Sequence, residues 1–141
     1  MRYPILALAT ALSISGGASA ATTQNDVNEA LRGNPAIYNG LFTAALIKHI
    51  VDTCPAVSPP GRLARVSHFL SLYNRARGMG YDRAQIEAFV EDAGEQARMR
   101  ALVEGHLQTA GVDPASETEV CAFARAQIAE RSALGRQLRE D

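Results

Sequence analysis

Apolar residues recur at helical spacing, in steps of three and four, throughout this chain. No segment alternates polar and apolar side chains in the way that a half-buried strand would. The sequence therefore predicts an all-α fold, a compact bundle of about five helices around a central apolar helix. The expected helices cover residues 25–31, 37–53, 62–77, 83–110 and 117–131, with a last turn or short helix at 134–138.

The segment 37–53 is the candidate for the central helix. Its apolar side chains surround most of its circumference, and they are Leu41, Phe42, Ala45, Leu46, Ile47, Ile50 and Val51. A helix that is apolar on nearly all sides is one surrounded by other helices. Lys48 and Asp52 lie four residues apart on one face, and we expect them to mark the narrow strip that reaches water.

Glycine, proline and capping residues set the expected helix ends. Gly33 and Pro35 end the first helix, which we expect to be peripheral, and residues 59–61 form a stiff connection. Three helix starts carry a capping box: Asp82 with Gln85, Asp92 with Glu95, and Ser116 with Glu119. The second box predicts a break or kink near residues 92–94 within the long helix 83–110.

Each remaining helix has an apolar stripe that we expect to be buried. On the third helix the stripe is Leu63, Val66, Leu70 and Tyr73, widened by Phe69 and Leu72. The stripe of the long helix is Ile86, Phe89 and Val90 before the break, and Met99, Leu102, Val103 and Leu107 after it. The last helix has Val120, Cys121, Ala124 and Ile128.

The first twenty residues have the features of an export signal. Arg2 gives a positive start, residues 5–14 are apolar and uncharged, and residues 18–20 form a small-x-small cleavage site. The apolar stretch is roughly half as long as a membrane anchor requires. We therefore expect a signal peptide at 1–20 and a single helical domain at 21–141, which is periplasmic or secreted and does not insert into the membrane after cleavage.

Cys54 and Cys121 are the two cysteines of the chain. In an oxidising compartment a pair of thiols normally forms a disulfide. The closed loop of roughly 70 residues would restrict the unfolded chain by about 4 kcal/mol in the chain-entropy model. Cys54 ends the central helix and Cys121 lies in the first turn of the last one, so the bond would staple that helix to the core.

The charge balance argues against two classes of partner. Without Arg2, 13 of the 14 basic residues remain against 15 acidic residues, a formal charge near −2. A protein without an excess of positive charge has no field that would hold nucleic acid or an anionic bilayer. We therefore expect neither partner.

The order of short motifs along the chain resembles one known family. These motifs are Gly40-Leu41, Cys54-Pro55, Gly80-Tyr81-Asp82, residues 85–90 and 97–101, Gly111-Val112, Cys121-Ala122, Ile128-Ala129 and residues 134–138. In this order, and with both cysteines, they resemble an uncharacterised family of small exported bacterial proteins, domain-of-unknown-function family five-three-three-three. The resemblance implies an exported helical domain and transfers no functional residue.

Candidate catalytic and metal-binding groups are sparse. His49, His68 and His106 fall on three different predicted helices, and no pair has the four-residue spacing that places two imidazoles on one helical face, so we expect no metal and no other cofactor. We expect His49 to be a hydrogen-bonded residue on the flank of the central helix. Glu87 and Glu91 lie four apart on one helix face, which is typical of a solvated surface, and we assign no catalytic residue.

A cluster of arginine and tyrosine side chains surrounds the glycine turn at 78–80, and its members are Tyr73, Arg75, Arg77, Tyr81 and Arg83. Tyrosine and arginine often anchor protein interfaces, because they combine a large contact area with directional polar groups. If the domain has an interaction surface, this cluster is where we expect it. Ordinary solvation of these residues, with local pairing to Glu87 and Glu91, is the alternative.

These observations favour a non-enzymatic, exported module of the bacterial periplasm that binds another envelope protein. Two alternatives remain open. One is a small envelope hydrolase that uses a carboxylate from Glu87 or Glu91, and the other is a purely structural component of the envelope.

Overall fold

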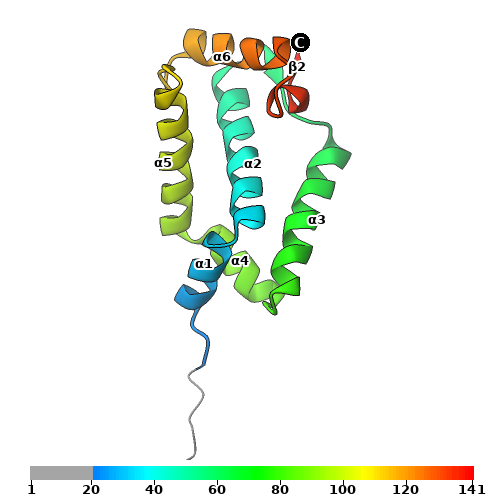
Figure 1. Ribbon diagram of the computed structural model, residues 1–141, viewed down its shortest axis with the longest axis vertical. Helices are drawn as coiled ribbons and strands as arrows, with labels where there is room; N and C mark the ends of the chain where they lie inside the picture. The colour runs from blue at the N-terminus through cyan, green and yellow to red at the C-terminus, as the bar shows by residue number, and fades with distance from the viewer. Residues whose placement is uncertain (1–20) are drawn as a thin grey trace, which may run out of the picture.

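The computed structural model describes residues 21–141, and this part of the chain folds into six α-helices and a two-stranded sheet (Figure 1). The predicted signal peptide, 1–20, lies outside the described residues. The helices are α1 Gln24–Arg32, α2 Pro35–Thr53, α3 Arg62–Gly78, α4 Arg83–Glu91, α5 Ala93–Thr109 and α6 Glu117–Ala129. A 3₁₀ turn follows at Gly135–Gln137, and the strands are β1 Val57–Ser58 and β2 Arg139–Glu140. The all-α prediction is confirmed.

Helix ends form where the capping residues predict them. Asp82 and Gln85 make a complete capping box at the start of α4. Asp92 and Ser116 each accept a hydrogen bond from the backbone N–H three residues on, which begins α5 and α6. The break between α4 and α5 lies at Asp92, as predicted, because its extended backbone ends one helix and caps the next.

The central position of α2 is confirmed. It contacts α1, α3, α5, α6 and β1, and in Figure 1 it runs between α5 and α3. Two hydrophobic clusters form the core. Ile50 of α2 and Cys54, the C-cap of α2, are fully buried in the larger cluster together with Leu107 and Val120. The Cys54–Cys121 disulfide lies within this cluster and joins the end of α2 to α6. Lys48 and Asp52 form an exposed ion pair at 2.6 Å, as expected for the strip that reaches water.

The smaller hydrophobic cluster corrects one expectation. α1 is not peripheral, because Val27 and Leu31 are buried with Ile37, Ile86 and Phe89 at the far end of the molecule from the disulfide. A nine-residue helix contributes two fully buried side chains because α1 lies across the ends of α2 and α4. Sequence spacing gives no information about that crossing.

The small sheet was not predicted. Val57 pairs antiparallel with Glu140, and Ser58 with Arg139, so the C-terminal segment lies against the connection between α2 and α3. Val57 and Leu138 are both buried in the larger cluster. Two-residue strands are too short to show alternation in the sequence. The pairing arises because the disulfide holds α6, and the segment that follows it, beside the end of α2.

The expected burial of the α3 stripe is wrong. Leu63 is 86% exposed, and Val66, Phe69 and Leu70 are each about half exposed. Within α3 only Leu72 and Ala76, both near its C-terminal end, are buried. Two other residues from the predicted stripes, Val90 and Leu102, are also exposed. Half of an apolar helix is therefore left uncovered by the rest of the domain.

Candidate functional site

α2 and α3 touch at one end and diverge toward the other. At the contact, a Cβ on Gly40 would lie 2.5 Å from Leu72 Cδ2, so a larger residue here would force the Leu72 side chain to move. One turn away, His68 Nε2 and the Gly40 carbonyl oxygen are hydrogen-bonded at 2.9 Å. Toward its N-terminus α3 leans away from α2 (Figure 1), and residues 62–67 are all exposed. The two helices therefore form a V.

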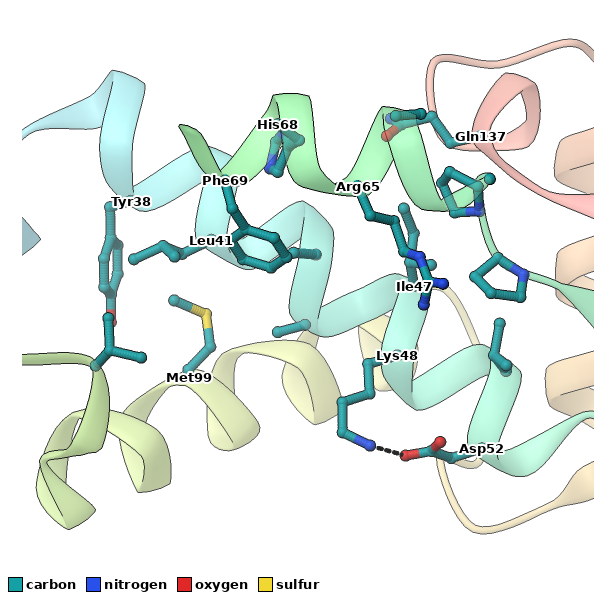
Figure 2. A pocket seen from close by; sticks show the side chains of 18 of the residues that line it. Tyr38, Leu41, Ile47, Lys48, Asp52, Arg65, His68, Phe69, Met99 and Gln137 are labelled. Carbon is teal, nitrogen blue, oxygen red and sulfur yellow. Dashed lines mark hydrogen bonds and ion pairs between the residues drawn. The ribbon is translucent and has the colours of Figure 1, made fainter. Parts of the chain in front are cut away.

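The space inside this V is an apolar groove of about 890 Å³. Leu41, Ala44 and Ile47 of α2 line it on one side, and Ala64 and Phe69 of α3 on the other. Figure 2 shows Phe69 beside Leu41, with Met99 of α5 approaching them from the opposite side. We name this space the α2–α3 groove. Its size falls within the range of roughly 300–1,000 Å³ that is usual for small-molecule sites.

The wide end of the α2–α3 groove is cationic. Arg65 of α3 and Arg136 and Arg139 from the C-terminal segment line it, together with Lys48. Lys48 is paired with Asp52, but none of the three arginines forms an ion pair with a carboxylate of residues 21–141. In Figure 2 the guanidinium of Arg65 extends from α3 past Ile47. The groove thus joins an apolar interior to an uncompensated positive end.

The narrow end of the groove contains a partly buried ion pair that sequence reasoning missed. Arg32 Nη2 donates to Glu95 Oε1 at 2.7 Å, and Arg32 Nε donates to both carboxylate oxygens at 3.2 Å. Glu95 is 8% exposed, and its hydrogen bonds raise the pKa of Arg32 above its ordinary value. The pair joins the end of α1 to the start of α5. The capping pattern assigned Glu95 to a local role, so nothing in the sequence pointed to Arg32.

Tyr38 is close enough to this pair for both charges to act on its phenol, and it lines the groove. Burial raises the pKa of Tyr38, and the negative charge of Glu95 raises it further. The phenol therefore stays neutral at any physiological pH, and it adds a polar group to an otherwise apolar end.

A second apolar surface lies on α3 outside the groove. Leu63, Val66 and Leu70 follow one another at steps of three and four, so they share one face of the helix. None of the residues from 53 to 81 is acidic, whereas Arg62, Arg65, Arg75 and Arg77 are basic. We name Leu63, Val66 and Leu70 the outer stripe. The near-neutral charge of the whole chain conceals this locally positive helix.

The members of the arginine–tyrosine cluster around residues 78–80 contact different partners. Arg83 pairs with Glu87 at 2.6 Å, and Arg77 donates to the backbone oxygen of Tyr81 at 3.1 Å. Tyr73 and Tyr81 are half-buried against the smaller cluster, and Arg75 is exposed. The local pairing considered as the alternative is present for Arg83. The role of this cluster as an interaction surface stays a prediction.

The histidines and the two candidate carboxylates, Glu87 and Glu91, form no metal site in the part of the chain that the structure describes. His49 Nε2 and the Pro114 carbonyl oxygen are hydrogen-bonded at 2.9 Å, as expected for a flank residue, and His106 contacts the rings of Phe42 and Phe123. Within residues 21–141, no three histidine, cysteine or carboxylate side chains lie close enough to hold a metal ion. Glu87 and Glu91 are both exposed, and with Ile86 and Phe89 they line a second, smaller hollow of about 460 Å³. The hydrolase alternative stays a prediction.

A comparison with protein families decides the classification. The model of a family of unknown function, DUF5333, matches residues 29–139. The chain belongs to the DUF5333 family. The match runs from the middle of α1 to β2, so the α2–α3 groove, the outer stripe and both cysteines lie within the DUF5333 region.

The remaining comparisons add no activity to this DUF5333 protein. A search of curated proteins and a search of solved structures each found no match to the chain. In the described part of the chain, none of the helices combines the length and the apolar character needed to cross a bilayer. The family assignment and the geometry above are therefore the basis for any functional conclusion.

Proposed function

We propose that this DUF5333 protein is an exported, non-enzymatic module of the periplasm that binds another envelope protein through the outer stripe of α3. The observation that carries the proposal is the exposure of Leu63, at 86%, beside the half-exposed Val66 and Leu70. Apolar side chains that gather on one exposed face mark an interaction site more often than scattered ones do. Burial of this face against a partner would remove apolar area from water and stabilise a complex.

The charge of α3 favours one kind of partner. An amphipathic helix with acidic residues along the borders of its apolar face would complement both the outer stripe and the arginines beside it. Arg62 and Arg77 lie at the two ends of α3, and neither pairs with a carboxylate of residues 21–141. The partner's carboxylates would therefore face free positive charges rather than compete for existing ion pairs.

The disulfide supports the proposed location. Cys54 and Cys121 are bonded, and disulfides persist mainly in oxidising compartments outside the cytoplasm. Cell fractionation followed by mass spectrometry of the protein tests this part directly. We expect a chain that begins at Ala21 and lacks free thiols in the periplasmic or secreted fraction. An unprocessed chain in the cytoplasm would contradict the location.

Site-specific photo-crosslinking in intact cells tests the partner surface. A photoreactive residue at Leu63 or Val66 should give a discrete adduct with one exported protein, and the crosslinked peptide should be an acidic amphipathic helix. Thr118 on α6, which is exposed and belongs to neither surface, is the matched control position. We expect no adduct there.

Three results would contradict the proposed partner. They are adducts of equal yield at Thr118, crosslinks to lipid instead of protein, and no adduct at any position on the outer stripe. A fourth result would favour the arginine–tyrosine cluster instead. If Arg75→Glu and Arg77→Glu abolish the adduct while Leu63→Asp does not, the arginine–tyrosine cluster is the interface and the outer stripe is not.

A further inference from the structure

We propose that the α2–α3 groove binds a fatty acid, with the acyl chain between α2 and α3 and the carboxylate at the cationic wide end. This site goes beyond the partner surface proposed above, because Leu63 and Val66 do not line the groove. The length of the groove, the distribution of polar groups along it and the charge at its wide end all fit such a ligand.

The length of the groove suits an extended ligand. Along α2 the lining runs from Tyr38 to Asp52, which corresponds to roughly 21 Å at the helical rise. The groove has a volume of about 890 Å³ and is open to solvent along one side. A single extended hydrocarbon chain can lie along it between α2 and α3.

The interior of the groove suits an acyl chain. Leu41, Phe69 and Met99 gather around the narrow half in Figure 2, and Phe89 also lines the groove. Methionine and leucine side chains adapt to a flexible chain through rotamer changes at low cost. The acidic groups that line the groove, Asp52 and Glu95, are already paired with Lys48 and Arg32. A hydrocarbon chain would therefore bury apolar surface without leaving a charge unpaired.

The wide end selects the head group. Arg136 Nη1 donates to the Arg131 carbonyl oxygen at 3.3 Å, and Arg139 Nη2 donates to the Pro59 carbonyl oxygen at 3.2 Å. These bonds hold the two side chains in place and leave their positive charges uncompensated. Arg65 makes no hydrogen bond with its guanidinium in the described part of the chain, so its planar fork is free to bind a carboxylate through two hydrogen bonds. An anionic head group would complete this end.

Titration of the purified protein with dodecanoate, below the concentration at which micelles form, tests the proposal. Isothermal calorimetry should show saturable binding of one molecule per chain. Dodecyltrimethylammonium has the same chain with a cationic head, and we expect it to bind at least tenfold more weakly. The chain contains no tryptophan, so Phe69→Trp gives a single reporter in the groove whose emission should shift to shorter wavelength on binding.

Two matched pairs of variants locate the site. Arg65→Glu should weaken dodecanoate binding about tenfold or more, because it replaces a charge-assisted contact by repulsion, whereas Arg62→Glu on the same helix should change it less than twofold. Ala64→Trp should block the groove, and Ser67→Trp should not. Ala64 and Ser67 are both exposed, so all four variants should keep the circular dichroism and unfolding midpoint of the wild type.

The following outcomes would overturn the proposal: no saturable binding of dodecanoate, equal affinity for dodecyltrimethylammonium, or wild-type affinity in Arg65→Glu. A concentration-dependent dimer that Ala64→Trp abolishes would show instead that a second copy fills the groove. Leu63→Asp separates this site from the partner surface. It should abolish the crosslinked adduct and leave dodecanoate affinity unchanged, so either proposal can fail without the other.

Discussion

Gly40 of α2 and Leu72 of α3 are in contact where the two helices cross, and the methyl groups of Leu72 occupy the space of the missing glycine side chain. This contact fixes the closed end of the V. Leu72 is 8% exposed. None of the first seven residues of α3, from Arg62 to His68, is buried. The position of one glycine therefore determines where the groove begins.

Alanine at Gly40 should destabilise the protein by about 1 kcal/mol or more, because overpacking at a helix contact outweighs the gain in helix propensity. Urea unfolding measures this. Gly105 of α5 is the matched control, since it is helical and no atom lies within 4 Å of a Cβ built there. Gly105→Ala should stabilise by up to about 1 kcal/mol. Equal effects at both positions would contradict the close approach of α2 and α3.

Serine at Leu63 should change the free energy of unfolding by less than about 0.5 kcal/mol, because this side chain is almost fully exposed. Alanine at Leu107, which is 0% exposed, should cost about 2–5 kcal/mol. Chemical denaturation of both variants makes the comparison. A loss of more than 2 kcal/mol at Leu63 would mean that α3 packs against the body of the domain and that the outer stripe is core.

Alanine at Glu95 should cost about 2 kcal/mol, because it leaves the partly buried guanidinium of Arg32 without its carboxylate. This figure is at the low end for a broken buried pair, since the Arg32 side chain is 33% exposed. Glu87→Ala removes the partner of Arg83 in an exposed pair and should cost no more than about 0.5 kcal/mol. Both free energies come from urea titrations at neutral pH. Equal small losses would show that water screens Arg32 as fully as it screens Arg83.

Replacement of both cysteines by serine should lower the free energy of unfolding by about 4 kcal/mol, the chain-entropy value for a loop of this length. The sequence separation is 67 residues, and both sulfurs lie in the larger cluster. Urea unfolding of the Cys54→Ser, Cys121→Ser variant measures the effect. A stability equal to that of the wild type would contradict the architectural role of the bond. Thiol labelling of the native wild type should detect no free cysteine.

The neutral phenol of Tyr38 should make stability depend on pH in alkaline solution. Because the folded-state pKa is raised, its contribution is fully present below the ordinary value near 10 and is lost as the pH rises through the folded pKa. Tyr38→Phe cannot ionise, so this variant should lose less stability than the wild type above about pH 10. Unfolding midpoints at a series of pH values give the comparison, and parallel curves would contradict the raised pKa.

Local features of the sequence determined the helices and their ends. Asp82, Asp92 and Ser116 cap the helices where the pattern predicted, and Cys54 lies at the end of α2 with its partner near the start of α6. These predictions succeed because a cap or a helix-breaking residue acts within one turn of the chain. The central position of α2 also followed, since a helix without a polar face has no stable place at a surface.

Only the tertiary structure decided which apolar faces are covered. The stripes of α3 and α5 look alike in sequence, yet Leu107 is fully buried and Leu63 is almost fully exposed. The difference depends on the angle at which α3 leaves Gly40, on the pairing of β1 with β2, and on α1 lying across the ends of α2 and α4. Hydrophobic periodicity gives the direction in which a side chain points. Whether another element lies there depends on contacts between residues far apart in the sequence.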